Sequence, residues 1–250
     1  MTSPARLQLV TPENSYPWVP WNRVARKIDE MWDPENAAHH SIIGLTGSGK
    51  SYLAVNGILG MCQYDRVLII DTKGDDPTTN KTGRVVRTLP KHTWYSAMGR
   101  RQDGPREKWY RLVVPDNLTT ARDVVGEALN NAYDEGEWVI YIDECWDVTG
   151  NNPDVGLRLE GIVSKIWRKG RSRHVSLVAA TQTPVSVPRL FYDQASFAWI
   201  GRIRDEERQK RLLEIGGMSK RDLPILASLN RREWLVAADN GEYFARTVVV

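Results

Sequence analysis

Gly44-Leu45-Thr46-Gly47-Ser48-Gly49-Lys50-Ser51 is a complete G-x-x-x-x-G-K-[ST] loop. This spacing cradles nucleotide phosphates, because its glycines let the backbone turn tightly and aim successive N–H groups at the anion. We expect Lys50 to reach the β- and γ-phosphates and the Ser51 hydroxyl to ligate Mg²⁺. The other predicted nucleotide contacts come from Gly44, Thr46, Gly47, Ser48 and Gly49 of the same loop.

The residues on either side of this loop predict a strand before it and a helix after it. Ser41-Ile42-Ile43 is short, apolar and β-branched like a buried strand, and the segment from Tyr52 to Gln63 can form a helix. A strand, a phosphate loop and a helix in this order are typical of an α/β domain with a mostly parallel sheet flanked by helices. A glycine-rich turn with an incidental lysine is the alternative, and this context disfavours it.

The length and composition allow one large α/β domain with a well-buried core. The chain has 250 residues, and we expect a nucleotide-binding domain over residues 39–250 after a Pro- and Trp-rich extension over residues 1–38. A net charge of +3 permits a nucleic-acid partner without demanding one. Cys62 and Cys145 have no metal-ligand spacing, so neither a disulfide framework nor a zinc site is expected. No apolar run is long enough to span a bilayer, so we expect no membrane partner and a cytoplasmic location.

The extension contains one segment with a helical pattern. Trp21 to Trp32 can form a short amphipathic helix, because Val24, Ile28 and Met31 fall near helical spacing. Such a helix can simply pack on the nucleotide domain. It can also clamp the adenine ring or contact a neighbouring subunit, and the sequence leaves these roles open.

A second strand, a basic segment and a long helix follow the phosphate loop. Val67 to Asp71 is an apolar run that suits a parallel strand covered on both faces. Residues 78–111 combine Arg and Lys with Trp and Tyr, a composition that can hold nucleic acid through phosphate contacts and stacking. A solvated insertion explains this segment equally well. The clearest helix runs from Thr119 to Glu135, with a capping box at Thr120 and Asp123.

The apolar strand from Trp138 to Ile142 ends in two acids, Asp143 and Glu144. We expect Asp143 to hold Mg²⁺ through its water shell opposite Ser51, and Glu144 to orient and polarise an attacking water. The second acid is typical of nucleotide hydrolases with an extra strand between the phosphate-loop strand and this one, and the strand from Val67 to Asp71 fits that topology. Two carboxylates that merely begin a polar loop are the alternative.

A further strand pattern, His174 to Ala180, follows the densest basic cluster, at residues 168–173, and ends in Thr181-Gln182. Gln182 therefore falls where a γ-phosphate sensor would lie, at a strand end beside Glu144. The remaining pattern predicts a strand over Ser196–Ile203, a helix from Asp205 through Ile215 that Gly216 and Gly217 end, and a C-terminal β-hairpin of Glu233–Ala238 and Glu242–Val250.

Four motifs occur together in this chain: T-G-S-G-K-S at 46–51, D-T-K-G at 71–74, Y-I-D-E at 141–144 and A-T-Q-T-P at 180–184. Together they resemble the FtsK/HerA branch of the P-loop ATPases, which includes viral genome-packaging ATPases, conjugation motors and chromosome translocases. The T-Q-x-P element discriminates most, because generic P-loop ATPases lack it. The resemblance covers most of residues 39–250 and implies a RecA-like, additional-strand catalytic-Glu ATPase domain that hydrolyses ATP with Mg²⁺ and moves double-stranded DNA.

The resemblance also implies a homo-oligomeric ring, a pentamer or hexamer, in which an arginine from the next subunit completes each nucleotide site. The matching stretch of this sequence holds Arg171 and Arg173. Arginine suits the role because it stays ionised and offers a planar fork of donors to the transferring phosphoryl group. We favour Arg171, and contact of both arginines with DNA phosphate or solvent is the alternative. The expected catalytic residues are then Glu144, Lys50, Arg171, Arg173 and Gln182.

Three functions stay open. The first is a double-stranded DNA translocase that packages a viral genome in the host cytoplasm, with a portal or procapsid as partner and the loops at 73–87 and 146–156 as candidate pore elements. We expect neither the membrane anchor of chromosome translocases nor the nuclease domain of large terminases. The second is a soluble motor for conjugation, segregation or repair. The third, from another class, is a nucleotide-dependent switch or assembly factor, against which Glu144 argues because a switch needs no positioned base.

Overall fold

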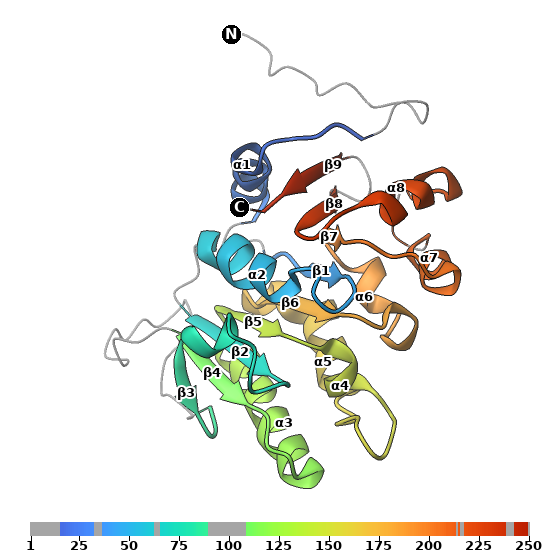
Figure 1. Ribbon diagram of the computed structural model, residues 1–250. Coiled ribbons are helices and arrows are strands. Elements are labelled where there is room, and N and C mark those ends of the chain that lie inside the picture. The colour runs from blue at the N-terminus through green and yellow to red at the C-terminus, as the bar shows by residue number, and fades with distance from the viewer. Residues whose placement is uncertain are drawn as a thin grey trace, which may run out of the picture.

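A nine-stranded, mostly parallel sheet forms the centre of the fold (Figure 1). The computed structural model describes residues 16–32, 37–62, 66–89, 109–213, 215, 218–238 and 243–249. The strand order is β3-β4-β2-β5-β6-β1-β7-β8-β9, in which neighbours from β3 to β7 are parallel and the β7-β8 and β8-β9 pairs are antiparallel. The strands are β1 (His40–Ile43), β2 (Arg66–Asp71), β3 (Arg84–Val86), β4 (Trp109–Val113), β5 (Trp138–Ile142), β6 (Ser176–Thr181), β7 (Phe197–Ile200), β8 (Glu233–Ala238) and β9 (Tyr243–Val248).

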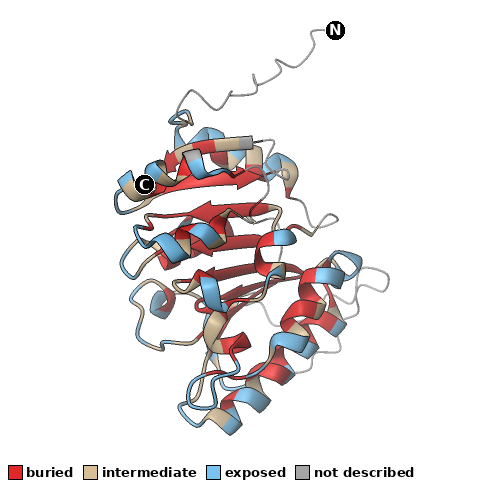
Figure 2. Cartoon of the chain, turned by 90° about the vertical axis from the view of Figure 1, so that its right-hand side faces the viewer, coloured by how far each residue is buried: buried red, intermediate tan, exposed pale blue. Residues whose placement is uncertain are grey.

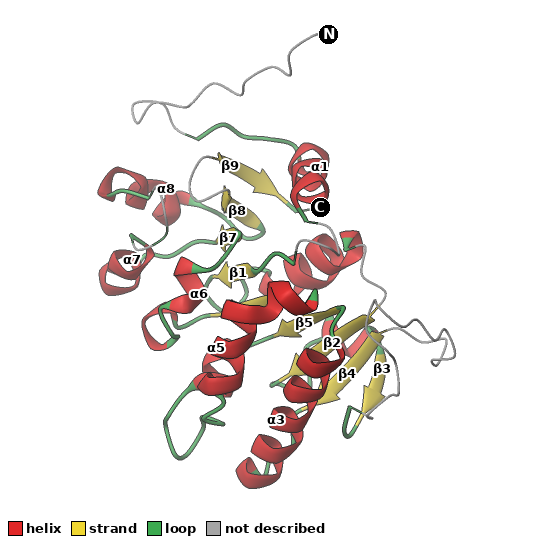
Figure 3. Ribbon diagram, turned by 180° about the vertical axis from the view of Figure 1, so that it is seen from behind, coloured by secondary structure: helices red, strands yellow, loops and turns green. Residues whose placement is uncertain are grey.

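Helices cover both faces of this sheet. Figure 3 shows α3 and α5 on one face, and Figure 1 shows α2 on the other. No helix in the described ranges is long and apolar enough to cross a membrane. The helices are α1 (Trp21–Met31), α2 (Lys50–Tyr52), which continues as a π-helix (Leu53–Ile58) and a 3-10 turn (Leu59–Met61), α3 (Leu118–Glu135), α4 (Cys145–Thr149), α5 (Glu160–Lys169), α6 (Leu190–Asp193), α7 (Glu206–Leu212) and α8 (Leu223–Ser228).

Strand β2 shows why the sheet needs helices on both sides. Leu68 and Ile70 belong to the hydrophobic cluster that includes the buried side chains of α3, whereas Val67 and Ile69 belong to the cluster of α1 and α2. Successive side chains of a strand point to opposite faces, so a strand that is apolar throughout must be covered twice. Figure 2 shows the buried strands between half-exposed helices. The predicted α/β class, its parallel sheet and its C-terminal hairpin are confirmed.

The strand inserted between the phosphate-loop strand and the acid-bearing strand is β6. It pairs with β5 on one side and with β1 on the other, whereas β2 pairs with β5 and β4 farther out. The prediction of an extra strand is therefore right, but its assignment to the strand from Val67 to Asp71 is wrong. An apolar pattern indicates that a buried strand exists, and it carries no information on which strand lies beside it.

The helix that precedes β5 is capped by a residue that the sequence did not suggest. The Asn117 side chain accepts a hydrogen bond from the Thr120 backbone N–H at 3.0 Å, and α3 begins at Leu118. The predicted capping box at Thr120 and Asp123 is therefore wrong, because Thr120 already lies within the first helical turn. Asn is as good an N-cap as Ser or Asp, so the helix itself is as stable as expected.

The remaining predicted elements occur with shifted ends. The helix after the phosphate loop, α2, begins at Lys50, two residues before the predicted start at Tyr52. Its predicted end at Gln63 lies outside the described residues. Strand β6 starts after His174, and β7 is shorter than predicted. Helix α7 is capped by the Asp205 side chain as predicted but ends at Leu212, and Gly216, Gly217 and the hairpin turn at residues 239–242 lie outside the described residues.

Residues 16–32 and 37–38 of the predicted N-terminal extension are described, and they include helix α1. Its Val24 and Ile28 are buried in the same cluster as the apolar side chains of α2. The Trp21 ring lies 5.9 Å from the ring of Trp199 in β7, between ring centroids. The helix is thus packed on the nucleotide domain. Residues 1–15 lie outside the described residues, and the domain boundary at residue 38 stays a prediction.

Two strands, β3 and β4, come from the segment that we interpreted as basic and aromatic. Arg111 in β4 is buried, and its guanidinium lies 3.1 Å from the Asp71 carboxylate at the end of β2. This arginine therefore joins two strands and does not face a nucleic acid. The tryptophan and tyrosine at positions 94 and 95 lie outside the described residues.

Candidate active site

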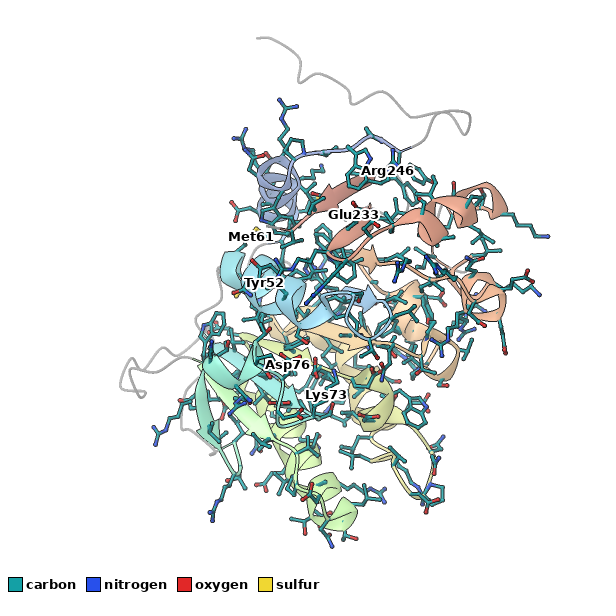
Figure 4. The ribbon with its side chains drawn as sticks, viewed as in Figure 1. Tyr52, Met61, Lys73, Asp76, Glu233 and Arg246 are labelled. Carbon is teal, nitrogen blue, oxygen red and sulfur yellow. The ribbon has the colours of Figure 1, made fainter. Side chains whose placement is uncertain are left out.

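The phosphate loop lies between β1 and α2, and two of its glycines have backbones that other residues rarely adopt. Gly47 and Gly49 have φ angles of 77° and 99°, in the left-handed region. A Cβ on Gly44 would come within 2.7 Å of the Ser48 hydroxyl. The loop is thus folded so that its N–H groups can face an anion. The helix that follows the loop carries Tyr52, which is labelled in Figure 4.

Lys50 is held inside this loop. Its side chain is buried, and the ammonium donates to the carbonyl oxygens of Gly44 at 2.9 Å and Leu45 at 3.2 Å. Burial lowers the pKa of Lys50 to about 8, the nearby charge of Lys73 adds to this, and the Glu144 carboxylate opposes it. The amine that is expected to reach the phosphates therefore already lies at the loop, paired with backbone oxygens that a phosphate can replace.

Ser51 and Asp143 lie together as the sequence predicted, and Asp76 joins them. The Ser51 hydroxyl is 2.8 Å from the Asp76 carboxylate and 3.2 Å from the Asp143 carboxylate. Asp143 is fully buried and also accepts from the Tyr141 hydroxyl at 2.8 Å. A hydroxyl and two carboxylates are hard oxygen donors of the kind that Mg²⁺ prefers, so these residues fit the expected metal.

A lysine pairs with the carboxylate of the expected metal site. The ammonium of Lys73 lies 2.8 Å from Asp143, and its side chain is 36 % exposed. Figure 4 shows Lys73 and Asp76 close together, below the helix that carries Tyr52. The sequence analysis places Lys73 in the D-T-K-G motif and at the start of a candidate pore loop, and gives it no role at the metal site. The signal that could have found both residues is the polar turn directly after β2, since polar residues at the carboxyl ends of parallel strands gather at one edge.

Glu144 is buried and held on both carboxylate oxygens. The Thr181 hydroxyl donates to one oxygen at 2.6 Å, and the Gln182 backbone N–H donates to the other at 3.0 Å. Burial raises the pKa of Glu144, although these two hydrogen bonds and the charge of Lys50 oppose the increase. The inserted strand β6 thus positions this acid, because its C-terminal end supplies both donors.

The side chain of Gln182 joins the same strand end to the phosphate loop. Its amide oxygen accepts a hydrogen bond from the Thr46 hydroxyl. The Gln182 backbone carbonyl accepts from the Arg208 guanidinium in α7 at 3.3 Å. Gln182 therefore contacts both the loop that would bind phosphate and, through its N–H, the carboxylate of Glu144.

The two arginines predicted to act on a neighbouring site lie far from this one. Arg171 and Arg173 are exposed in the short 3-10 helix Gly170–Arg173, which precedes the N-terminal end of β6. The C-terminal end of the same strand, at Thr181, lies beside the phosphate loop. The arginines are thus at the opposite edge of the sheet, and their role in another subunit stays a prediction.

A further arginine packs against the loop helix and was not predicted. The Arg232 guanidinium lies 4.0 Å above the centre of the Tyr52 ring. Its backbone N–H donates to the Ser48 carbonyl at 2.9 Å, and its φ of 63° is left-handed. The residue just before β8 therefore supports the phosphate loop from outside.

The overall structure resembles solved ATPases. B204, the genome packaging NTPase from Sulfolobus turreted icosahedral virus 2, matches in complex with sulfate at a TM-score of 0.61 and 15% identity, over 86% of this chain and 98% of that one. Its complex with ATP-gammaS matches at a TM-score of 0.59 and 14% identity, over 87% and 100%. This is the fold of the P-loop ATPases.

Two further solved structures match, one at a similar and one at a lower TM-score. VirB4 of Thermoanaerobacter pseudethanolicus has a TM-score of 0.62 and 13% identity over 85% of this chain and 89% of that one. The pCW3 conjugation coupling protein TcpA has a TM-score of 0.55 and 17% identity over 86% and 60%. No family model and no curated protein sequence matches the chain. The resemblance to FtsK/HerA-type ATPases is thus confirmed in the fold, at low identity.

Proposed function

We propose that this chain is an ATP-driven translocase of double-stranded DNA, and that it serves as the packaging motor that pumps a viral genome into a procapsid. The position of Glu144 carries the proposal. Its buried carboxylate is held by Thr181 and Gln182, next to the phosphate loop. A positioned base is needed for hydrolysis and has no use in a switch that only binds nucleotide.

The residues of the site divide the hydrolytic work among them. Bound Mg²⁺ would supply the charge that offsets the β- and γ-phosphates, with Ser51 and Asp143 to hold it. Lys50 would exchange its two carbonyl partners for phosphate oxygens. Glu144 would take a proton from the attacking water, and the raised pKa of its buried carboxyl group makes it a stronger base than an exposed glutamate. Gln182 would sense the γ-phosphate through its contact with Thr46.

Support for DNA as the partner comes from the compared proteins and from the charge of one loop. B204 is described as a genome packaging NTPase and TcpA as a conjugation coupling protein. In this chain Lys81, Arg84 and Arg87 are exposed around β3, within the predicted pore loop. Such cations can grip the phosphate backbone and cannot read bases alone, so we expect little sequence specificity.

A motor for conjugation, segregation or repair is the second candidate. The similarity to TcpA, which is described as a conjugation coupling protein, favours it as a specific observation. Both candidates share the same chemistry at the nucleotide. The neighbouring genes separate them, because portal and capsid genes accompany packaging, whereas relaxase or partition genes accompany the alternative.

ATPase assays with and without double-stranded DNA test the proposal. We expect DNA to stimulate hydrolysis at low salt and the stimulation to fall steeply as salt rises, because phosphate contacts release counterions. Glu144→Gln should still bind ATP but hydrolyse it at least about 100-fold more slowly. Glu127→Gln, an exposed carboxylate of α3, is the matched control and should keep normal turnover. Hydrolysis without any DNA stimulation at low salt would favour the switch, and near-normal turnover of Glu144→Gln would reject Glu144 as the base.

A further inference from the structure

A lysine side chain, Lys73, lies beside the carboxylates of the expected metal site. The Lys73 ammonium lies 2.8 Å from the fully buried Asp143. This ion pair offsets negative charge on Asp143 that would otherwise be buried without a partner.

The turn that carries Lys73 has a fixed backbone. The Asp71 carboxylate accepts from the backbone N–H groups of Lys73 at 3.2 Å and Gly74 at 2.9 Å. It also accepts from the Thr79 hydroxyl at 3.2 Å and pairs with Arg111 at 3.1 Å. Because Asp71 fixes the backbone of the turn, the long and partly exposed side chain of Lys73 can leave Asp143 while the turn stays folded.

Asp76, in contrast, is held at the site. One oxygen of its carboxylate accepts from the Thr78 backbone N–H at 2.8 Å, and the other accepts from the Ser51 hydroxyl at 2.8 Å. These hydrogen bonds fix the position of the Asp76 carboxylate. A fixed carboxylate beside Ser51 can accept hydrogen bonds from the water shell of a metal, which Mg²⁺ usually keeps in part.

We propose that Lys73 is a resident counter-ion of the metal site, that Mg²⁺ displaces it from Asp143, and that Asp76 remains to hold the water shell of the metal. The inference rests on the proposed use of Mg²⁺ with ATP. Two cations close to one carboxylate repel each other, so binding of the metal weakens the ion pair of Lys73 with Asp143. Lys73 begins the predicted pore loop, and its release adds one free positive charge there when the metal is bound.

Metal titration of the full chain with Mn²⁺ as probe, followed by electron paramagnetic resonance, tests this. Without nucleotide, Lys73→Met should bind Mn²⁺ at least fivefold more tightly than the unaltered chain, and Asp76→Asn at least fivefold more weakly. Lys73→Arg keeps the charge and should bind like the unaltered chain. Lys81→Met, an exposed lysine of the same loop, is the matched control and should change the affinity less than twofold. Equal or weaker Mn²⁺ binding by Lys73→Met overturns the proposal.

A second measurement needs no variant and covers the case in which Lys73→Met does not fold. The unaltered chain is treated with an amine-acylating reagent in EDTA and in Mg²⁺, and the labelled lysines are quantified by mass spectrometry. Labelling of Lys73 should rise more than twofold in Mg²⁺, while that of Lys81 stays constant. Unchanged or reduced labelling of Lys73 contradicts displacement. ATP binding is measured separately, so a chain that shows the metal effect but binds no nucleotide refutes the proposed function alone.

Discussion

At the scale of single residues, the hydrogen bond from the Thr181 hydroxyl to Glu144 can be tested by a substitution that keeps the shape of the side chain. The hydroxyl donates to the Glu144 carboxylate at 2.6 Å. Thr181→Val has almost the same shape but removes this hydrogen bond and the one that the hydroxyl accepts from the Thr183 backbone N–H at 3.0 Å. A hydrogen bond to a charged group contributes about 1.5–3 kcal/mol. We expect kcat to fall about tenfold with little change in KM, because the proposed role of Glu144 lies in the chemical step and not in binding.

Thr181→Val should also shift the pH dependence of kcat in one direction. The Thr181 hydrogen bond lowers the pKa of Glu144 against the effect of burial, so its loss raises that pKa further. Because hydrolysis needs the ionised base, the acidic limb of the kcat profile should move to higher pH in Thr181→Val. Thr181→Ser keeps the hydroxyl and should leave the limb in place. A uniform drop in kcat at every pH would indicate a merely structural role.

The sequence predicted some residues of this site and missed others for a physical reason. Ser51, Asp143 and Glu144 come from motifs with fixed spacing, and the structure brings them together. Lys73 and Asp76 lie in a turn whose path toward the loop depends on Asp71 and Arg111, which are 40 residues apart in the chain. Local spacing cannot show a contact of that range. The catalytic roles themselves stay predictions.

At the scale of elements, the start of β1 predicts how stability depends on pH. His39 and His40 are buried, and each accepts a hydrogen bond at Nδ1, from the Leu177 backbone N–H and the Trp199 indole N–H. Burial lowers the pKa of His39 to about 4 and that of His40 to about 3. Both rings are therefore neutral in the folded chain, since a protonated Nδ1 would face another donor.

The consequence is a loss of stability in acid. The unfolded chain binds protons at these histidines below about pH 6.5 while the folded chain does not, so their stabilisation is complete above that pH and is lost as the pH falls toward 4. When the pH is lowered from 7.5 to 5, the two histidines together should reduce the free energy of unfolding by about 4 kcal/mol. Urea unfolding at the two pH values measures it. His40→Gln should remove about half of the pH effect, and His174→Asn, at the left-handed residue before β6, should leave it unchanged. An equal pH effect in His40→Gln contradicts the assignment.

The loop around β3 is the predicted pore element whose exposed cations allow a test of DNA contact. Lys81 and Arg87 are exposed there. Replacing both with Ala should weaken DNA stimulation of the ATPase and reduce the slope of log affinity against log salt by about 0.9 for each DNA phosphate that is no longer neutralised. Basal hydrolysis should stay unchanged. Arg23→Ala combined with Arg122→Ala, two exposed arginines of α1 and α3, controls for net charge, and an equal effect in that variant would argue against a specific DNA contact at β3.

The strands show which elements the sequence pattern can predict and which it cannot. Buried strands such as β2 and β5 are apolar throughout, so the sequence predicted them. Strands β3 and β4 were both missed. The side chains of β3 are exposed or half-buried at the edge of the sheet, where no apolar pattern is required. The apolar run of β4 is interrupted by Arg111, which is buried in an ion pair with Asp71. The order of the strands was missed for β6, since pairing partners depend on the whole sheet.

At the scale of the whole molecule, the nucleotide site and the predicted arginine finger face opposite ways. The phosphate loop lies at the carboxyl edge of the parallel strands, and Arg171 lies at the amino edge, before β6. One chain cannot therefore bring its Arg171 to its own nucleotide. A head-to-tail arrangement of subunits, which closes into a ring when the rotation allows, can bring one edge against the other.

This geometry predicts complementation between two inactive variants. Arg171→Ala keeps its own phosphate loop and lacks the finger, whereas Lys50→Ala lacks the loop lysine and keeps the finger. Each alone should hydrolyse ATP slowly, because every interface of its ring contains the same defect. In an equal mixture about a quarter of the interfaces pair an intact loop with an intact Arg171 if subunits mix at random, and ATPase activity should recover in proportion. Arg168→Ala, an exposed arginine of the same cluster, should be active alone. If co-assembly is demonstrated and no ratio restores activity, Arg171 does not act across the interface, and Arg173→Ala takes its place in the same assay.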